Sequence, residues 1–199
     1  MAIAFTAGTC GRRGANLKGE GMSRFLVIRA GLVLAAGLVV AVTAVAVASG
    51  NASTRNVQVL DACDPATFNA AVRPGTCTRP GGGVKHSEFI SQLQTQGEAP
   101  AWRFSPEGLD LATGGTLLAT NRGGEDHTFT EVAAFGGGCV APLNAILGLT
   151  PVPECSTPGL FNSTLVEQGD TLEVSGLKVG VHRFECLIHP WMRTTVVVR

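Results

Sequence analysis

The residues best suited to chemistry lie in one stretch near the C-terminus, Gly180 to Val198. Within it, Cys186, His189 and Met192 follow one another at intervals of three, between two segments whose composition is typical of β-strands. A thiolate, an imidazole and a thioether at this spacing converge only if the loop folds around one point. Soft sulfur together with imidazole suits copper better than magnesium, calcium or manganese. The motif therefore predicts a copper-binding loop.

A second imidazole is available upstream. His127 follows the polar, glycine-containing segment Asn121-Arg-Gly-Gly-Glu-Asp and begins another predicted strand. His127, Cys186 and His189 would form the trigonal plane of a blue-copper electron-transfer site, and Met192 would be its long, weak axial ligand. We predict that these four residues bind one type 1 copper ion.

The segment Phe-Glu-Cys-Leu-Ile-His-Pro-Trp-Met-Arg and the valine run after it resemble the cupredoxin family, most closely amicyanin and plastocyanin-like domains. The resemblance covers roughly residues 101–199 and implies a small exported β-sandwich that carries single electrons. Three positions depart from the family pattern: Thr128 stands where Asn is frequent, Leu187 where a hydroxyl residue is frequent, and His182 where an aromatic residue is frequent. These departures concern hydrogen bonds around the metal, which tune its redox potential.

Other functions fit these residues less well. Zinc is commonly bound by histidine and cysteine, but Met192 would then have no role as a ligand. Cys186 and His189 could form a nucleophile pair, yet no other part of a hydrolase site is present. The chain has four histidines, too few for a multicopper oxidase, although a copper site shared within a homotrimer stays open on count alone. We predict a non-enzymatic electron carrier, with copper storage, delivery or tolerance as the alternative.

The docking site for a redox partner is expected beside the same loop. Pro190 and Trp191 are apolar neighbours of His189, and Pro190 also stiffens the loop by fixing its own φ. We predict a small hydrophobic patch for a partner protein, with the ring edge of His189 as the electron exit.

The charge pattern argues against nucleic acid as a partner. The formal net charge is zero, but five of the 15 basic residues and one of the 15 acidic residues precede Ser49. The remainder is mildly acidic and has no basic stripe, whereas nucleic-acid-binding domains concentrate Lys and Arg on one face.

The N-terminal part has the pattern of an export signal. A basic start at 22–29 precedes an apolar run over 30–48, which ends in the small residues Ala46-Val-Ala48. The run is close to the ~20 residues that span a bilayer, so a retained membrane anchor is an alternative, and a buried core helix is a more remote one. Export in either form predicts a periplasmic, secreted or outward-facing membrane-anchored protein.

The six cysteines agree with an oxidising compartment. Cys10 precedes the export signal and Cys186 belongs to the copper motif, which leaves four residues and three possible pairings. We predict the local pairs Cys63–Cys77 and Cys139–Cys155, each worth about 3 kcal/mol in the chain-entropy model. Four unpaired thiols are the alternative.

The remaining pattern predicts an all-β, Greek-key β-sandwich built from short strands separated by Gly and Pro. We divide the chain into a leader and signal or anchor (1–48), a disulfide-closed, partly helical extension (49–100) and a cupredoxin-like domain (101–199). Helices are expected near 65–72 and 87–97, and a loop inserted at 133–162 is expected to contain one at 143–149. Strands are expected at 102–104, 109–111, 116–120, 127–132, 171–174, 181–186 and 194–198, with Phe129 and Phe184 in the core beneath the metal.

Overall fold

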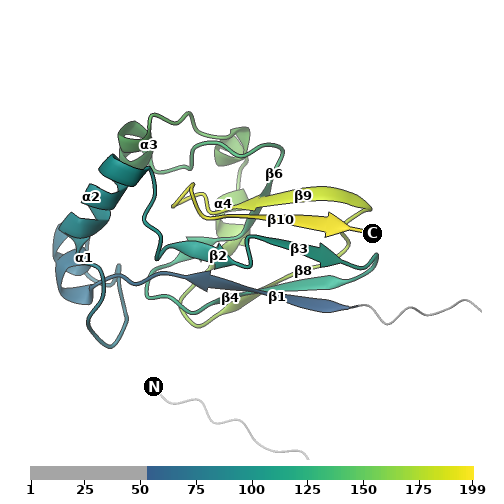
Figure 1. Ribbon diagram of the computed structural model, residues 1–199, viewed down its shortest axis with the longest axis horizontal. Helices are drawn as coiled ribbons and strands as arrows, with labels where there is room; N and C mark the ends of the chain where they lie inside the picture. The colour runs from purple at the N-terminus through teal and green to yellow at the C-terminus, as the bar shows by residue number, and fades with distance from the viewer. Residues whose placement is uncertain (1–52) are drawn as a thin grey trace, which may run out of the picture. The chain divides into compact units, whose positions relative to one another are not determined.

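The computed structural model describes residues 53–199, whose strands form two four-stranded sheets and a short two-stranded ladder (Figure 1). The predicted export signal or anchor and Cys10 lie outside the described residues. Among the helices that are described, none has the length and apolar character needed to cross a bilayer.

The first sheet has the strand order β2-β1-β4-β8. Its strands are β1 (Thr54–Leu60), β2 (Arg103–Ser105), β4 (Thr116–Asn121) and β8 (Thr171–Val174). β1 runs parallel to β4 and antiparallel to β2. The sequence analysis predicted no strand at β1, so a segment of the predicted extension contributes a central strand to the sandwich.

The second sheet has the order β3-β10-β9-β6. It consists of β3 (Gly108–Leu111), β6 (Thr130–Val132), β9 (Gly180–Glu185) and β10 (Arg193–Val198). The separate ladder pairs β5 (His127–Thr128) with β7 (Leu165–Val166). Together with the first sheet, these strands confirm the predicted β-sandwich.

The core lies between the two sheets because alternate side chains of each strand point inward. In β4 and β10 every second residue is buried. Phe129 and Phe184 are each 1% exposed, and their rings stack with centroids 4.4 Å apart and an interplanar angle of 5°. Both were predicted core residues.

Short helices accompany the sandwich, most of them at one end (Figure 1). They are α1 (Pro65–Ala71), α2 (His86–Gln96), α3 (Ala141–Leu147) and α4 (Leu160–Ser163), with a 3-10 turn at Pro153–Ser156. The helices predicted near 65–72, 87–97 and 143–149 are thus confirmed. Figure 1 shows α1, α2 and α3 at the end of the molecule toward which the loop between β9 and β10 points.

Local signals explain where α1 and α2 begin and end. The Asp64 carboxylate accepts a hydrogen bond from the backbone N–H of Thr67 at 2.9 Å, and Pro65 occupies the first turn of α1, where no N–H is needed. α2 ends at Gly97, whose φ of 76° is the left-handed conformation that glycine adopts without strain.

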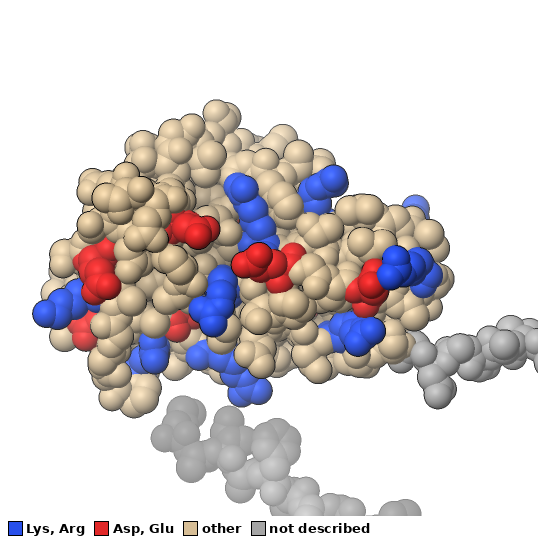
Figure 2. Space-filling model, in the orientation of Figure 1, with Lys and Arg blue, Asp and Glu red and all other residues tan. Residues whose placement is uncertain are grey.

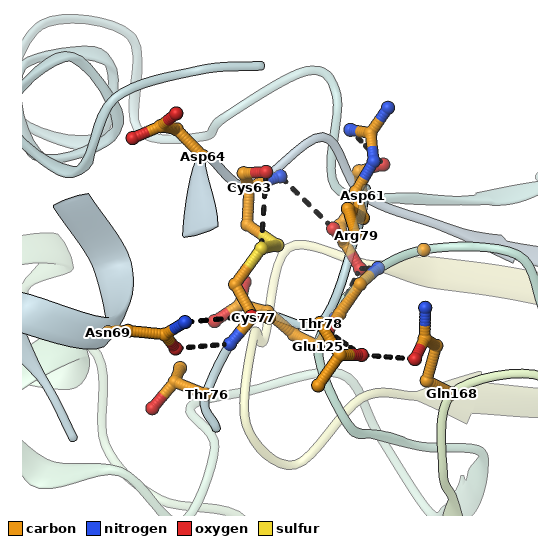
Figure 3. Close-up of a disulfide and its surroundings, with 12 residues drawn as sticks. Asp61, Cys63, Asp64, Asn69, Thr76, Cys77, Thr78, Arg79, Glu125 and Gln168 are labelled. Atoms are coloured by element: carbon orange, nitrogen blue, oxygen red, sulfur yellow. Dashed lines mark hydrogen bonds between the residues drawn. A yellow bond between two sulfur atoms is a disulfide. The ribbon is translucent and has the colours of Figure 1, made fainter. Parts of the chain in front are cut away.

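Both predicted disulfides are present, Cys63–Cys77 and Cys139–Cys155. Figure 3 shows the first of them joined to α1 by Asn69, whose side-chain amide bonds the backbone N–H and C=O of Cys77 at 2.9 Å each. The second closes the predicted insertion on itself. Each bond therefore fixes a segment that packs at the helical end of the sandwich.

Charges on the surface are mixed in sign. Figure 2 shows basic and acidic side chains interspersed on one face, with uncharged residues over α3. This face carries no continuous basic stripe of the kind that follows a nucleic-acid backbone.

We expect Phe129→Ala to reduce the free energy of unfolding by about 3–5 kcal/mol, because the substitution removes a fully buried ring and leaves a cavity. The measurement is urea unfolding of the metal-free chain. Val179→Ala is the control, because Val179 is 69% exposed and a change there should stay within about 0.5 kcal/mol. Equal effects of the two substitutions would contradict this placement of the core.

Candidate metal centre

Three of the four predicted ligands converge at the helical end of the sandwich. His127 begins β5, Cys186 directly follows β9, and His189 lies in the loop that leads to β10. The Cys186 Sγ lies 3.8 Å from Nδ1 of His127 and 3.9 Å from Nδ1 of His189, and the two ring nitrogens are 3.2 Å apart. His127 and Cys186 are fully buried and His189 is 4% exposed.

The fourth residue, Met192, closes the loop. Its backbone N–H donates to the carbonyl of His189 at 2.9 Å, and its own carbonyl accepts the N–H of Cys186 at 3.1 Å. The Met192 side chain is fully buried in the same core cluster as Cys186. The backbone of this loop is therefore held by its own hydrogen bonds, and its sulfur residues are out of contact with water.

The spacing of the three converging donors fits a transition-metal ion. With metal–nitrogen distances of about 2.0–2.1 Å and a metal–sulfur distance of about 2.3 Å, a trigonal plane puts nitrogens about 3.6 Å apart and nitrogen and sulfur about 3.8 Å apart. The spacings in this chain, 3.2, 3.8 and 3.9 Å, are close to these values. Residues that could hold a metal are thus His127, Cys186 and His189.

Asp61 is an essential part of this arrangement that the sequence analysis missed. It follows β1 directly, and its carboxylate accepts the backbone N–H groups of Cys63, Gly124 and Glu125 at 2.8–3.1 Å. The same carboxylate lies 3.0 Å from Nε2 of His127. The ring of His127 is thereby oriented with Nδ1 toward Cys186.

Glycine at position 123 makes this close approach possible. A Cβ atom at Gly123 would lie 1.8 Å from an Asp61 carboxylate oxygen. Any larger residue would therefore displace the carboxylate from His127. The Gly-Gly pair in the segment before His127 thus has a structural purpose: it lets the end of β1 pack against the turn that leads into β5.

The pKa values of Asp61, His127 and Cys186 indicate three neighbouring groups whose charges alternate in sign: negative, positive and negative. Burial opposes the charge on all three groups, but hydrogen bonds and neighbouring charges prevail. They hold the pKa of Asp61 at about 2, raise the pKa of His127 to about 10 and bring the pKa of Cys186 well below its ordinary value. The directions of these shifts favour a thiolate at Cys186 beside an imidazolium at His127.

Two backbone N–H groups also point at the sulfur of Cys186. They belong to Thr128, at 3.4 Å, and His189, at 3.5 Å. The Thr128 hydroxyl in turn accepts the N–H of Leu187 at 2.7 Å. Although Thr128 and Leu187 differ from the residues frequent in the family, the Cys186 sulfur still has two N–H donors. The bond between Thr128 and Leu187 also connects β5 directly to the loop that contains Cys186.

Arg193 holds the loop from the other side. Its Nε donates to the Glu185 carboxylate at 3.1 Å and to the carbonyl of Pro190 at 2.7 Å, and its Nη2 donates to the carbonyl of Gly136 at 2.8 Å. Burial raises the pKa of Glu185 to about 7, against the lowering effects of Gly136 and Arg193. Arg193 thus connects both ends of the loop to the insertion at 133–162.

His189 lies beneath three aromatic residues, Phe89, Trp102 and Trp191, which we call the aromatic roof. Their ring centroids are 6.2, 6.5 and 5.4 Å from that of His189. The sequence analysis expected the ring edge of His189 to be the electron exit. His189 is the most exposed of the three converging residues, but only at 4%. Pro190 is also buried, and of the roof residues only Trp191 is more than 3% exposed.

Glu125 forms the second carboxylate of the centre. Its Oε2 accepts the indole N–H of Trp102 at 2.6 Å and lies 3.8 Å from Nε2 of His189. Burial raises the pKa of Glu125, partly offset by His189 and by the hydrogen bond from Trp102. Each imidazole therefore faces the sulfur with Nδ1 and a carboxylate with Nε2.

The two remaining histidines of the chain, His86 and His182, lie apart from these residues. His182 pairs with Glu131 at 2.6 Å on the surface of β9. His86, at the start of α2, packs its ring edge-on against Phe68 at 5.1 Å.

Comparison with known proteins gives matches among solved structures only. No protein-family model and no curated protein sequence matches the chain. A purple cupredoxin from Nitrosopumilus maritimus is 19% identical, with a TM-score of 0.40 over 72% of this chain and 98% of that protein. A reduced amicyanin variant is 20% identical, with a TM-score of 0.32 over 49% of this chain and 73% of that one. A plastocyanin variant of fern is 14% identical, with a TM-score of 0.37 over 73% of this chain and all of that one.

With its two sheets and the His, Cys and His residues gathered at one end, the chain has a cupredoxin-like fold. This is the fold that the sequence resemblance implied.

We expect Asp61→Asn to lower the pKa of His127 substantially below about 10 in the metal-free protein, because the anionic partner of the imidazolium is lost. Nitrogen NMR of the imidazole across a pH titration measures this shift. Asp126→Asn is the matched control, since Asp126 is exposed and adjacent to His127. An unchanged pKa in Asp61→Asn would mean that Asp61 does not stabilise the charged ring.

Proposed function

We propose that the protein binds one copper ion in a type 1 centre and serves as a one-electron carrier outside the cytoplasm. His127, Cys186 and His189 would be the strong ligands and Met192 the axial one. The observation that carries the proposal is the buried triangle of two Nδ1 atoms and one thiolate sulfur, spaced 3.2–3.9 Å apart.

The donor set favours copper over zinc. A thiolate and two imidazoles serve both metals, but a thioether completes the site characteristic of blue copper and not that of structural zinc. Copper, when bound, supplies a reversible one-electron change. The chain's own contribution is to keep the thiolate deprotonated, exclude water and fix the ligands on strand ends held by hydrogen bonds.

The residues favour electron transfer over catalysis. Multicopper oxidases and copper nitrite reductases need further histidine-rich sites. In the described part of the chain, His86 and His182 lie apart from the centre, with other contacts. Cys186 is fully buried, which is unsuitable for a nucleophile that must reach a substrate. We therefore propose a protein that is not an enzyme.

Copper storage, delivery or tolerance is the second candidate because it requires the same ligands. The enclosure of the site distinguishes the two roles in principle. A handling protein must release its ion to an acceptor, whereas His127, Cys186 and Met192 are fully buried and His189 is 4% exposed. This enclosure favours retention of the metal and thus the carrier.

The proposed location is periplasmic, secreted or membrane-anchored and facing outward. Two disulfides in the described residues support it, because such bonds persist mainly in oxidising compartments. The proposed membrane attachment would be through the apolar N-terminal segment. A redox protein is proposed to dock near His189, Pro190 and Trp191, where Trp191 is half-buried at the surface of the roof.

The test of the copper centre is an optical and electron-paramagnetic-resonance spectrum of the chain with one equivalent of copper(II). We expect intense visible absorption that Cys186→Ser abolishes, because the thiolate–copper bond gives rise to it. His182→Ala is the control and should keep the spectrum, since His182 lies outside the centre. Retention of the absorption in Cys186→Ser would refute the ligand assignment.

Met192→Gln tests the axial position. We expect this variant to bind copper with a lower redox potential, because an oxygen donor stabilises copper(II), as measured by voltammetry. Met192→Leu controls for packing, since a volume-conserving exchange should cost less than about 1.5 kcal/mol of unfolding free energy. A higher potential in Met192→Gln would contradict the proposed role of the thioether.

A further inference from the structure

A cavity opens beside the metal centre, between α1, α2 and α3. Its volume is about 570 Å³, within the ~300–1,000 Å³ range of small-molecule sites. Most of its wall is apolar. The side chains that define this wall are Phe68, Phe89, Ile90, Leu143, Ile146 and Ile188.

Two polar residues that also belong to the metal centre line the same cavity, His189 and Glu125. His189 turns Nδ1 toward Cys186 and His127, and its Nε2 lies 3.8 Å from the Glu125 carboxylate, which lines the cavity with it. Of the Glu125 carboxylate, Oε2 is occupied by the indole N–H of Trp102. Oε1 accepts no hydrogen bond from any residue in the described part of the chain.

We infer that this cavity binds a small planar aromatic molecule whose hydroxyl group donates a hydrogen bond to Glu125, with its ring beside His189. We infer an aromatic ligand from the wall of the cavity. The rings of Phe68, Phe89 and His86 line it and pack edge-to-face or tilted, with centroids 5.1–6.2 Å apart. A further aromatic ring can pack against them in the same way. The hydroxyl follows from Glu125, because a carboxylate in an apolar cavity needs a donor.

The charge around the cavity supports a neutral donor. An anionic group would lose its hydration against a mostly apolar wall, while Arg73 and Asp126 both line the cavity and offset each other. The cavity has the volume of a small-molecule site, and a molecule bound in it would lie against His189, which lines the cavity.

Binding in the cavity does not require copper. If the bound molecule exchanges electrons with the centre, that role rests on the proposed function. The test therefore uses the metal-free full chain, so that absence of a copper spectrum and absence of binding are separate results.

The experiment is calorimetric and NMR titration of the chain with 4-methylphenol, toluene and 4-methylbenzoate. We expect NMR shifts at residues lining the cavity when 4-methylphenol binds, and an affinity about twofold to tenfold higher than that of toluene, because toluene has no hydroxyl group to donate to Glu125. 4-Methylbenzoate should bind most weakly. Glu125→Gln should reduce the preference for 4-methylphenol over toluene.

Leu143→Trp should fill the cavity and weaken 4-methylphenol at least about tenfold, whereas Leu160→Trp in α4, away from the cavity, should leave its affinity unchanged. Equal affinity for toluene and 4-methylphenol would overturn the role of Glu125. No saturable binding of 4-methylphenol, or binding that Leu143→Trp does not weaken, would overturn the site itself.

Discussion

The centre depends on the hydrogen bond between Asp61 and His127. A thiolate and an imidazolium enclosed away from water are costly unless each charge has a partner. Asp61 supplies the negative charge on the side of His127 away from Cys186. Three backbone N–H groups hold the Asp61 carboxylate in place. The ring of His127 is therefore held in one orientation, with Nδ1 toward the position that a metal would take.

The segment before residue 100 contributes to this interaction and to the surroundings of the site. β1 places Asp61 behind His127, α2 contributes Phe89 to the aromatic roof, and the Cys63–Cys77 bond fixes the chain between them. A sandwich made from residues 101–199 alone would retain all four sequence-predicted ligands. It would lack both the charge partner of the first imidazole and part of the cover of the second.

The features that the sequence could predict depend on residues close together in the chain, and those it could not depend on contacts between residues far apart in the chain. Cys186, His189 and Met192 are recognisable because their spacing is local, and α1 because Asp64 and Pro65 begin it. Asp61 has no such signal: it looks like any acidic residue in a loop, and its contact with His127 spans 66 positions. The alternation of Val57 and Val59 was the available sign of β1, but two apolar residues among polar ones are a weak pattern for a buried strand.

The loop that carries three of the ligands is restrained from independent directions. From β5, the Thr128 hydroxyl accepts the backbone N–H of Leu187. From the insertion, the N–H of Cys139 donates to the carbonyl of Leu187. Arg193 bonds both ends of the loop and the carbonyl of Gly136. The proposed electron transfer would be favoured if the predicted ligands moved little between oxidation states, and a loop with such restraints has few alternative positions. The helices and the insertion thus restrain a loop that the strand ends alone would hold less firmly, and His189 lines the cavity between α1, α2 and α3.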